Sequence, residues 1–360
     1  MLRCLISNKQ QIIIIVIALL FFGIGMTLRT QWRVDYNFWQ DENHQINQIP
    51  SSLSAIMHAR FDIQFSGDNI LLSPFYKVFG KNKWGLAIPH IMVTLLGFYL
   101  FYLLCRTYFR TIGGYLIAFS LFAYNYNLIK HAFELRPYSV LVTLSMASFL
   151  ICKYIIENEK PPIIIRILVC LFIFIASFFH LWSAYSLFFN YAFHLLMSRK
   201  NKSIRSVLYS HAKYYGITII IIIPLLWKVL SVPHYSWGSV PETFEFIHKG
   251  IIPIAKGVFG NITGPRIFYP LLIGLIISFF VPHKERIKQI MFFMVLIVIP
   301  VAGLLMLCII HPYWFIQRHF IWTVPLFAFF LGWCWDSIII YAMGKFQRPK
   351  KVLENMGEEE

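Results

Sequence analysis

Long apolar runs, separated by short basic or aromatic segments, dominate this chain. A helix rises about 1.5 Å per residue, so roughly 17–25 apolar residues are needed to cross the hydrocarbon core of a bilayer. We place such runs at residues 12–28, 87–105, 112–129, 138–155, 163–180, 182–198, 214–231, 267–282, 289–310 and 320–342. The sequence therefore predicts an all-α polytopic membrane protein with about ten transmembrane helices.

The composition supports this class. Of the 360 residues, 58% are hydrophobic and only 13% are charged, whereas about 25% are charged in a typical soluble domain. Too few polar side chains remain to cover a soluble fold. Lys9 precedes the first run, as in a signal peptide, but no small-residue cleavage site follows, so we expect an uncleaved anchor. The six cysteines form no C-x-x-C pair, which favours small buried side chains over disulfides or metal ligands.

The net charge of +16 predicts an orientation in the membrane and no nucleic-acid partner. Lys and Arg occur in short clusters between apolar runs, such as "SRKNKSIRS" and "GKFQRPKK", as expected for cytoplasmic ends of membrane helices. We therefore expect both termini in the cytoplasm and extracytoplasmic loops at 29–86 and 232–266. Residues 1–345 then form one transmembrane domain, and 346–360 a charged cytoplasmic tail.

Acidic residues gather on the outer side of this topology. Eight of the 16 fall there: Asp35, Asp41, Glu42, Asp62, Asp68, Glu134, Glu242 and Glu245. Five of the eight lie in the first loop, where "SSLSAIMHARF" at 51–61 also has the apolar spacing of a short helix lying on the membrane. Asp336 is predicted near the inner end of the last span. No acid is predicted at mid-membrane, which weighs against an ion-coupled transporter.

The outer ends of several spans carry polar groups among aromatic residues. Asp41 and Glu42 are adjacent in the first loop, and further along stand "LSPFYKVF" at 72–79, "HAFELRPYS" at 131–139, "FFHLWS" at 178–183 and "HPYWFIQRHF" at 311–320. This layout resembles the GT-C superfamily of polyprenyl-phosphate-sugar-dependent glycosyltransferases. It is most similar to the branch that contains protein O-mannosyltransferases and the lipid A aminoarabinose transferase.

The resemblance rests on motifs in order along the chain. Asp41-Glu42 matches the family's acidic pair, and Pro74-Phe75-Tyr76 matches a Pro-Leu-Tyr-Tyr-like stretch. The Glu-x-Arg-x-Tyr element is matched by Glu134, Arg136 and Tyr138, a later His by His180, and a final Arg-Tyr imperfectly by Arg318-His319. The family's Arg ahead of the second span is replaced by Ala87 and Ile88, so Lys81, Lys83 or Arg136 would have to contact the donor phosphate.

The resemblance implies inverting transfer of a glycosyl group from a polyprenyl-phosphate-linked sugar to an acceptor hydroxyl outside the cytoplasm. The acceptor class, whether protein, lipid or glycan, stays open. Asp41 would be the base and Glu42 its neighbour. Substrate would be bound by Pro74, Tyr76, Glu134, Arg136, Tyr138, His180 and Arg318.

These residue types suit that chemistry. A phosphate leaves as a stable anion, so the acid of a glycosidase pair is unnecessary. One carboxylate can take the acceptor proton, and Arg can hold the phosphate through two parallel hydrogen bonds. No nucleotide-binding motif is present, which favours a lipid-linked donor. No cofactor is expected. Asp41 and Glu42 could bind a divalent metal, although no third ligand is evident.

Other interpretations stay open. Asp41-Glu42 is also compatible with a solvated loop pair, Glu134-Arg136 with a structural ion pair, and the aromatic residues with an interfacial belt. His131 and His180 are typical of hydrogen-bonding groups at a membrane boundary. The rival functions are a transporter or flippase of a lipid-linked saccharide, a membrane scaffold without catalytic activity, and a membrane-bound polysaccharide polymerase or ligase.

Overall fold

The computed structural model describes residues 8–49, 67–158, 162–165, 181–198, 286–300 and 321–356, with a few single positions between these ranges. The described part is mostly helical and contains no strand. Its larger helices are α1 (Asn8–Asp35), α5 (Lys83–Tyr108), α8 (Tyr138–Glu157), α10 (Leu181–Ser198) and α17 (Thr323–Met356). The predicted spans 214–231 and 267–282, most of 163–180, and the segment 51–61 lie outside the described residues.

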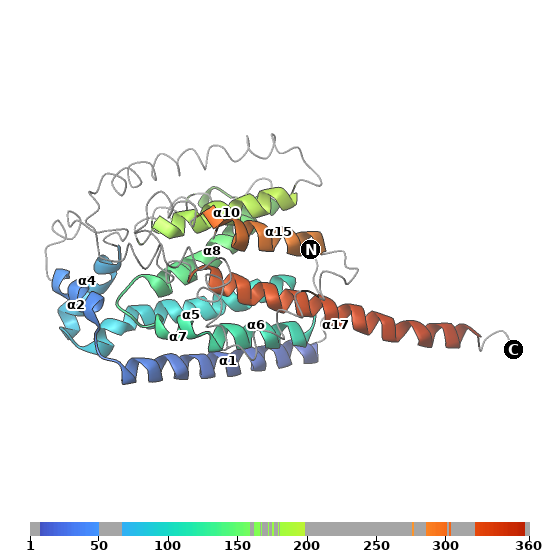
Figure 1. Ribbon diagram of the computed structural model, residues 1–360, viewed down its shortest axis with the longest axis horizontal. Coiled ribbons are helices and arrows are strands. Elements are labelled where there is room, and N and C mark those ends of the chain that lie inside the picture. Colours follow the sequence, from blue (N-terminus) through green and yellow to red (C-terminus); the bar gives the residue numbers. More distant parts are fainter. Residues whose placement is uncertain are drawn as a thin grey trace, which may run out of the picture.

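Shorter helices complete the described part. They are α2 (Gln40–Gln48), α4 (Gly67–Phe79), α6 (Ile112–Tyr124), α7 (Tyr126–Lys130) and α15 (Arg286–Phe293), the last continuing as a π-helical turn over Met294–Val298. The longer helices run side by side, α2 and α4 lie together at one end, and the last turns of α17 project from the opposite end (Figure 1).

Within the described residues, four helices are long and apolar enough to cross a membrane. They are α1, α5, α8 and the part of α17 from Thr323 to Gly344. This supports a helical membrane protein. Several predicted boundaries move: α1 continues through Arg29 to Asp35, α5 already begins at Lys83, and α17 runs past residue 345 to Met356. The first loop is therefore shorter than predicted, and it contains the two short helices α2 and α4.

The predicted span at 112–129 is wrong as a single helix, because it is broken at Asn125. The Asn125 side chain accepts a hydrogen bond from Leu128 N at 2.9 Å and caps the start of α7. Arg29 of α1 donates to Phe122 O at 3.2 Å and to Ala123 O at 3.1 Å, which are carbonyl groups at the end of α6. The last carbonyls of a helix have no partner within it, and the helix dipole favours a cation there. Polar side chains thus supply hydrogen-bond partners to the last carbonyls of α6 and to the start of α7.

Helix α6 packs closely against α17. A Cβ atom on Gly332 would lie 2.7 Å from Ala118 Cβ and 2.8 Å from the backbone oxygen of Gly114, so only glycine fits at this contact. At the start of α6, Asp336 of α17 accepts hydrogen bonds from Thr111 N at 2.7 Å and Thr111 Oγ1 at 2.6 Å. Small residues and buried hydrogen bonds are typical of helix contacts within membranes. Asp336 thus holds Thr111, whose own side chain caps the start of α6 by accepting a hydrogen bond from Gly114 N at 3.3 Å.

Candidate functional site

Glu42 ties the short helix α2 to two other parts of the chain. Its Oε1 accepts hydrogen bonds from Arg33 Nη1 at 2.8 Å and from Leu135 N at 2.9 Å. Its Oε2 accepts from Trp39 N at 3.2 Å, which closes the first turn of α2. The carboxylate is 1% exposed and the Arg33 side chain 5%. Glu42 thus fixes α2 against the end of α1 and the segment that leads into α8.

The surroundings of Glu42 have opposing effects on the pKa of its carboxyl group. Burial raises the pKa of Glu42 above its ordinary value, and the nearby Glu134 charge acts in the same direction. The Arg33 guanidinium and the hydrogen bonds from Leu135 and Trp39 act to lower this pKa. A carboxylate enclosed in this way holds structure together and has no free face for a substrate.

Asp41, the neighbour of Glu42, faces a different partner. Its Oδ2 accepts a hydrogen bond from Arg136 Nη2 at 3.0 Å. The side chains remain 30% exposed at Asp41 and 17% at Arg136, so water and solutes can reach both. The two residues are 95 positions apart in the sequence, and docking of α2 beside the start of α8 brings them together. The structure therefore joins the acid and the arginine that the sequence motifs single out.

The segment between α7 and α8 carries the rest of the Glu-x-Arg-x-Tyr element. Glu134 Oε2 lies 2.8 Å from His131 Nδ1, and both side chains are buried. Tyr138, the first residue of α8, is fully buried, and its ring centre lies 5.1 Å from that of His131. Glu134 and Tyr138 thus face the bundle, whereas Arg136 faces the exposed Asp41.

A buried polar network beneath α2 was not predicted from the sequence. Asp68 of α4 accepts a hydrogen bond from Gln45 Nε2 at 2.6 Å, and its Oδ1 lies 3.6 Å from His90 Nε2. His90 Nδ1 lies 3.0 Å from Ser139 Oγ. Burial raises the pKa of Asp68, while the charges of His90 and Arg136 and the Gln45 hydrogen bond act to lower it. The only sequence signal was that Asp68 belongs to the outer group of acids.

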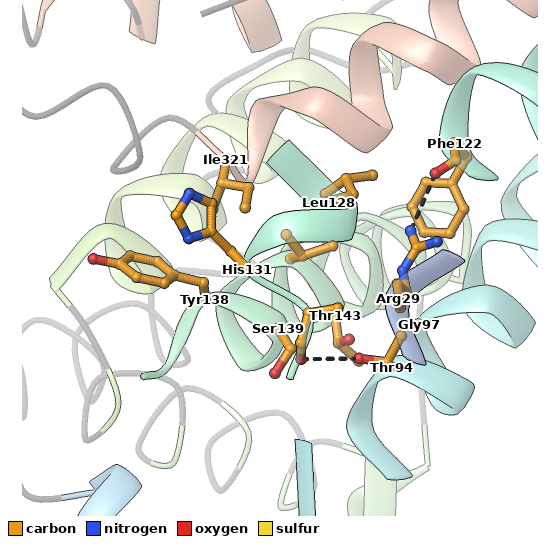
Figure 2. A pocket seen from close by; sticks show the side chains of 12 residues that line it. Arg29, Thr94, Gly97, Phe122, Leu128, His131, Tyr138, Ser139, Thr143 and Ile321 are labelled. Carbon is orange, nitrogen blue, oxygen red and sulfur yellow. Dashed lines mark hydrogen bonds between the residues drawn. The ribbon is translucent and has the colours of Figure 1, made fainter. Parts of the chain in front are cut away.

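A small cavity of about 20 Å³ lies next to this network (Figure 2). Its wall includes Arg29, Thr94, His131, Tyr138 and Ser139, and Figure 2 shows the rings of His131 and Tyr138 on one side and Arg29 on another. Thr94 Oγ1 donates to Ala132 O at 3.4 Å across this region. The volume suits about one water molecule, so this cavity cannot hold a sugar.

The other predicted site residues are less closely connected. Pro74 lies inside α4, and Tyr76 packs against a buried apolar cluster formed by Ile46, Ile49, Leu72, Leu86 and Leu135. Lys81 and Lys83 follow α4, where they donate to Asn47 Oδ1 and Val34 O. His180 and Arg318 lie outside the described residues. Among the residues that the structure describes, no group of three or more His, Cys, Asp or Glu side chains could hold a metal ion.

Taken together, the described site consists of a partly exposed ion pair next to a buried frame. Asp41 can accept a proton, Arg136 can bind an anionic oxygen, and the frame of Arg33, Glu42 and Leu135 fixes the helix that carries Asp41. Comparison with protein-family models, with curated proteins and with solved structures gives no match. The family drawn from the sequence motifs therefore stays a prediction.

Proposed function

We propose that this protein is an inverting glycosyltransferase that uses a polyprenyl-phosphate-linked sugar and works on the extracytoplasmic side of the membrane. The observation that carries the proposal is the ion pair between Asp41 and Arg136, with 3.0 Å between Asp41 Oδ2 and Arg136 Nη2. A base for the acceptor and a cation for the leaving phosphate are the two groups that this reaction needs, and here both lie side by side and partly exposed.

The reaction transfers the sugar in a single displacement. The acceptor oxygen attacks the anomeric carbon and forms the new glycosidic bond, while Asp41 takes the proton of the acceptor hydroxyl. The bond from the anomeric carbon to the phosphate oxygen breaks, and its electron pair leaves with the polyprenyl phosphate. Arg136 stabilises the negative charge that grows on this phosphate, a contribution that is often the largest in catalysis. Attack opposite the leaving group inverts the anomeric carbon.

Glu42 has a positioning role in this scheme, because its two oxygens are held by Arg33, Leu135 and Trp39. We further propose that the whole chain has about ten transmembrane helices and that α2 and α4 face the extracytoplasmic side. A cysteine in place of the exposed Asn43 should react with a membrane-impermeant maleimide added to intact cells. Labelling only after the cells are opened would place the site on the cytoplasmic side.

The function is tested with purified protein and a panel of radiolabelled polyprenyl-phosphate sugars. Wild type is expected to transfer sugar from at least one donor. Asp41→Asn is expected to lose about 10²- to 10⁴-fold in rate, the usual contribution of a general base. The matched control is Asp35→Asn, an identical change at an exposed acid that accepts a hydrogen bond from Gln31, and it should retain activity. Equal rates for Asp41→Asn and wild type would remove Asp41 from the chemistry.

A further inference from the structure

The two adjacent acids of α2 make ion pairs that differ in how far they are exposed to water. The side chains of Arg33 and Glu42 are only 5% and 1% exposed, so water could not solvate either charge if this pair opened. The pair between Arg136 and Asp41 is 17% and 30% exposed, so water reaches both side chains and can replace part of the interaction. This second pair is therefore the easier one to open.

The more exposed pair occupies the base that the proposed function requires. In the described structure, Asp41 Oδ2 accepts a charge-assisted hydrogen bond from Arg136 Nη2. While the guanidinium holds Oδ2, it covers part of the carboxylate, and an acceptor hydroxyl can reach only the lone pairs that remain. Asp41 is therefore fully open to the acceptor only when Arg136 moves to another anion.

The donor brings such an anion. A sugar-bearing polyprenyl phosphate is a diester with one negative charge, and the released polyprenyl phosphate carries up to two. Guanidinium groups bind phosphate oxygens in the same bidentate way as carboxylates. As the glycosidic bond breaks, the charge on the phosphate grows, so the competition for Arg136 shifts further towards the phosphate in the transition state.

We propose that the ion pair between Arg136 and Asp41 is a resting-state latch, which the donor phosphate opens by taking Arg136 and so freeing Asp41 as the base. This inference rests on the proposed function and adds an order to it: donor binds before a productive acceptor. The Glu42 frame keeps α2 in place while Arg136 changes partner, because its own contacts do not involve Arg136.

The latch makes a prediction about binding that does not involve sugar transfer. If Asp41 competes with phosphate for Arg136, removing its charge should tighten phosphate binding even though it abolishes activity. We use farnesyl phosphate as the probe and farnesol as the matched compound without phosphate, with the full-length protein in detergent and isothermal titration calorimetry as the readout. Asp41→Asn is expected to bind farnesyl phosphate about two- to fivefold more tightly than wild type, the range set by an exposed ion pair.

The controls separate the latch from simpler explanations. Asp35→Asn removes the same charge from the nearby end of α1 and should leave the affinity unchanged. Arg136→Gln should weaken binding of farnesyl phosphate, and none of the variants should change binding of farnesol. Asp41→Ser replaces Asp41→Asn if the latter does not elute as a single species with wild-type thermal stability.

The outcomes distinguish the two proposals. Wild type that binds farnesyl phosphate, with Asp41→Asn no tighter, overturns the latch and leaves the glycosyltransferase proposal standing. Tightening by Asp35→Asn to the same extent also overturns the latch, because the effect would then be general electrostatics. Wild type that shows no preference for farnesyl phosphate over farnesol removes the donor-binding premise, and both proposals fall with it.

Discussion

Replacing Glu42 by Gln should destabilise the protein strongly, although the change is nearly isosteric. The amide oxygen can still accept the hydrogen bond from Leu135 N, but the Arg33 guanidinium loses the negative charge at 2.8 Å from its Nη1. Because the Arg33 side chain is 5% exposed, its charge then remains buried without that carboxylate. Breaking a buried pair in this way costs about 3–5 kcal/mol. A loss of 1 kcal/mol lowers the melting temperature of a protein of 150–250 residues by roughly 2–4 °C. At the lower cost of about 3 kcal/mol, the melting temperature should therefore fall by about 6–12 °C.

The assay is thermal unfolding of purified protein in detergent, followed by intrinsic tryptophan fluorescence. Asp41→Asn is the adjacent control and should cost less, about 1 kcal/mol, because its ion pair is partly open to water. The double variant Arg33→Met with Glu42→Gln should recover much of the loss, since it removes the stranded charge. If Glu42→Gln melts within a degree or two of wild type, Glu42 is not the tie that holds α2, and the reasoning from burial fails.

Three further predictions concern the bundle. Gly332→Ala should cost about 1–3 kcal/mol, because the added Cβ would meet the backbone oxygen of Gly114 at 2.8 Å; an unchanged melting temperature would contradict this contact. Asp336→Ala should lower the free energy of unfolding more than Asp336→Asn, because alanine leaves both donors of Thr111 without an acceptor. Each unpaired donor costs about 1–3 kcal/mol, and unfolding by denaturant would measure the difference between the two variants. Burial raises the pKa of Asp68 from 3.8, so the folded state keeps a proton that the unfolded chain has released. Stability should therefore fall as pH rises from about 4 through the raised pKa, and a melting profile against pH should be flatter in Asp68→Asn.

The long helices could be predicted from the sequence because continuous apolar runs leave few alternatives. Helices α1, α5 and α8 each contain a predicted span, and α17 from Thr323 onward covers most of the predicted span at 320–342. Their ends could not be predicted, because polar residues such as Arg29 continue a helix when a neighbour accepts their hydrogen bonds. The break at Asn125 has a local signal, because Asn is a common N-cap residue. The contact of Arg29 with the last carbonyls of α6, 93 or 94 positions away in sequence, has no such signal.

The site could be predicted in part, because the motifs name residue types and not contacts. Asp41 and Arg136 were expected at one membrane boundary, and the structure places them 3.0 Å apart. The difference between Asp41 and Glu42 could not be foreseen, because it arises from which side of α2 meets Arg33 and Leu135. The network of Gln45, Asp68 and His90 is held together across three helices and has no signature in sequence spacing.

The hydrogen bonds from Thr111 to Asp336 join residues 225 positions apart. At about 5–20 residues per second, the ribosome needs roughly 11–45 s to reach Asp336 after it has made Thr111. During that interval Thr111 at the start of α6 lacks the acceptor that Asp336 provides. This contact between α6 and α17 can therefore form only late in synthesis, after the last described helix has been made.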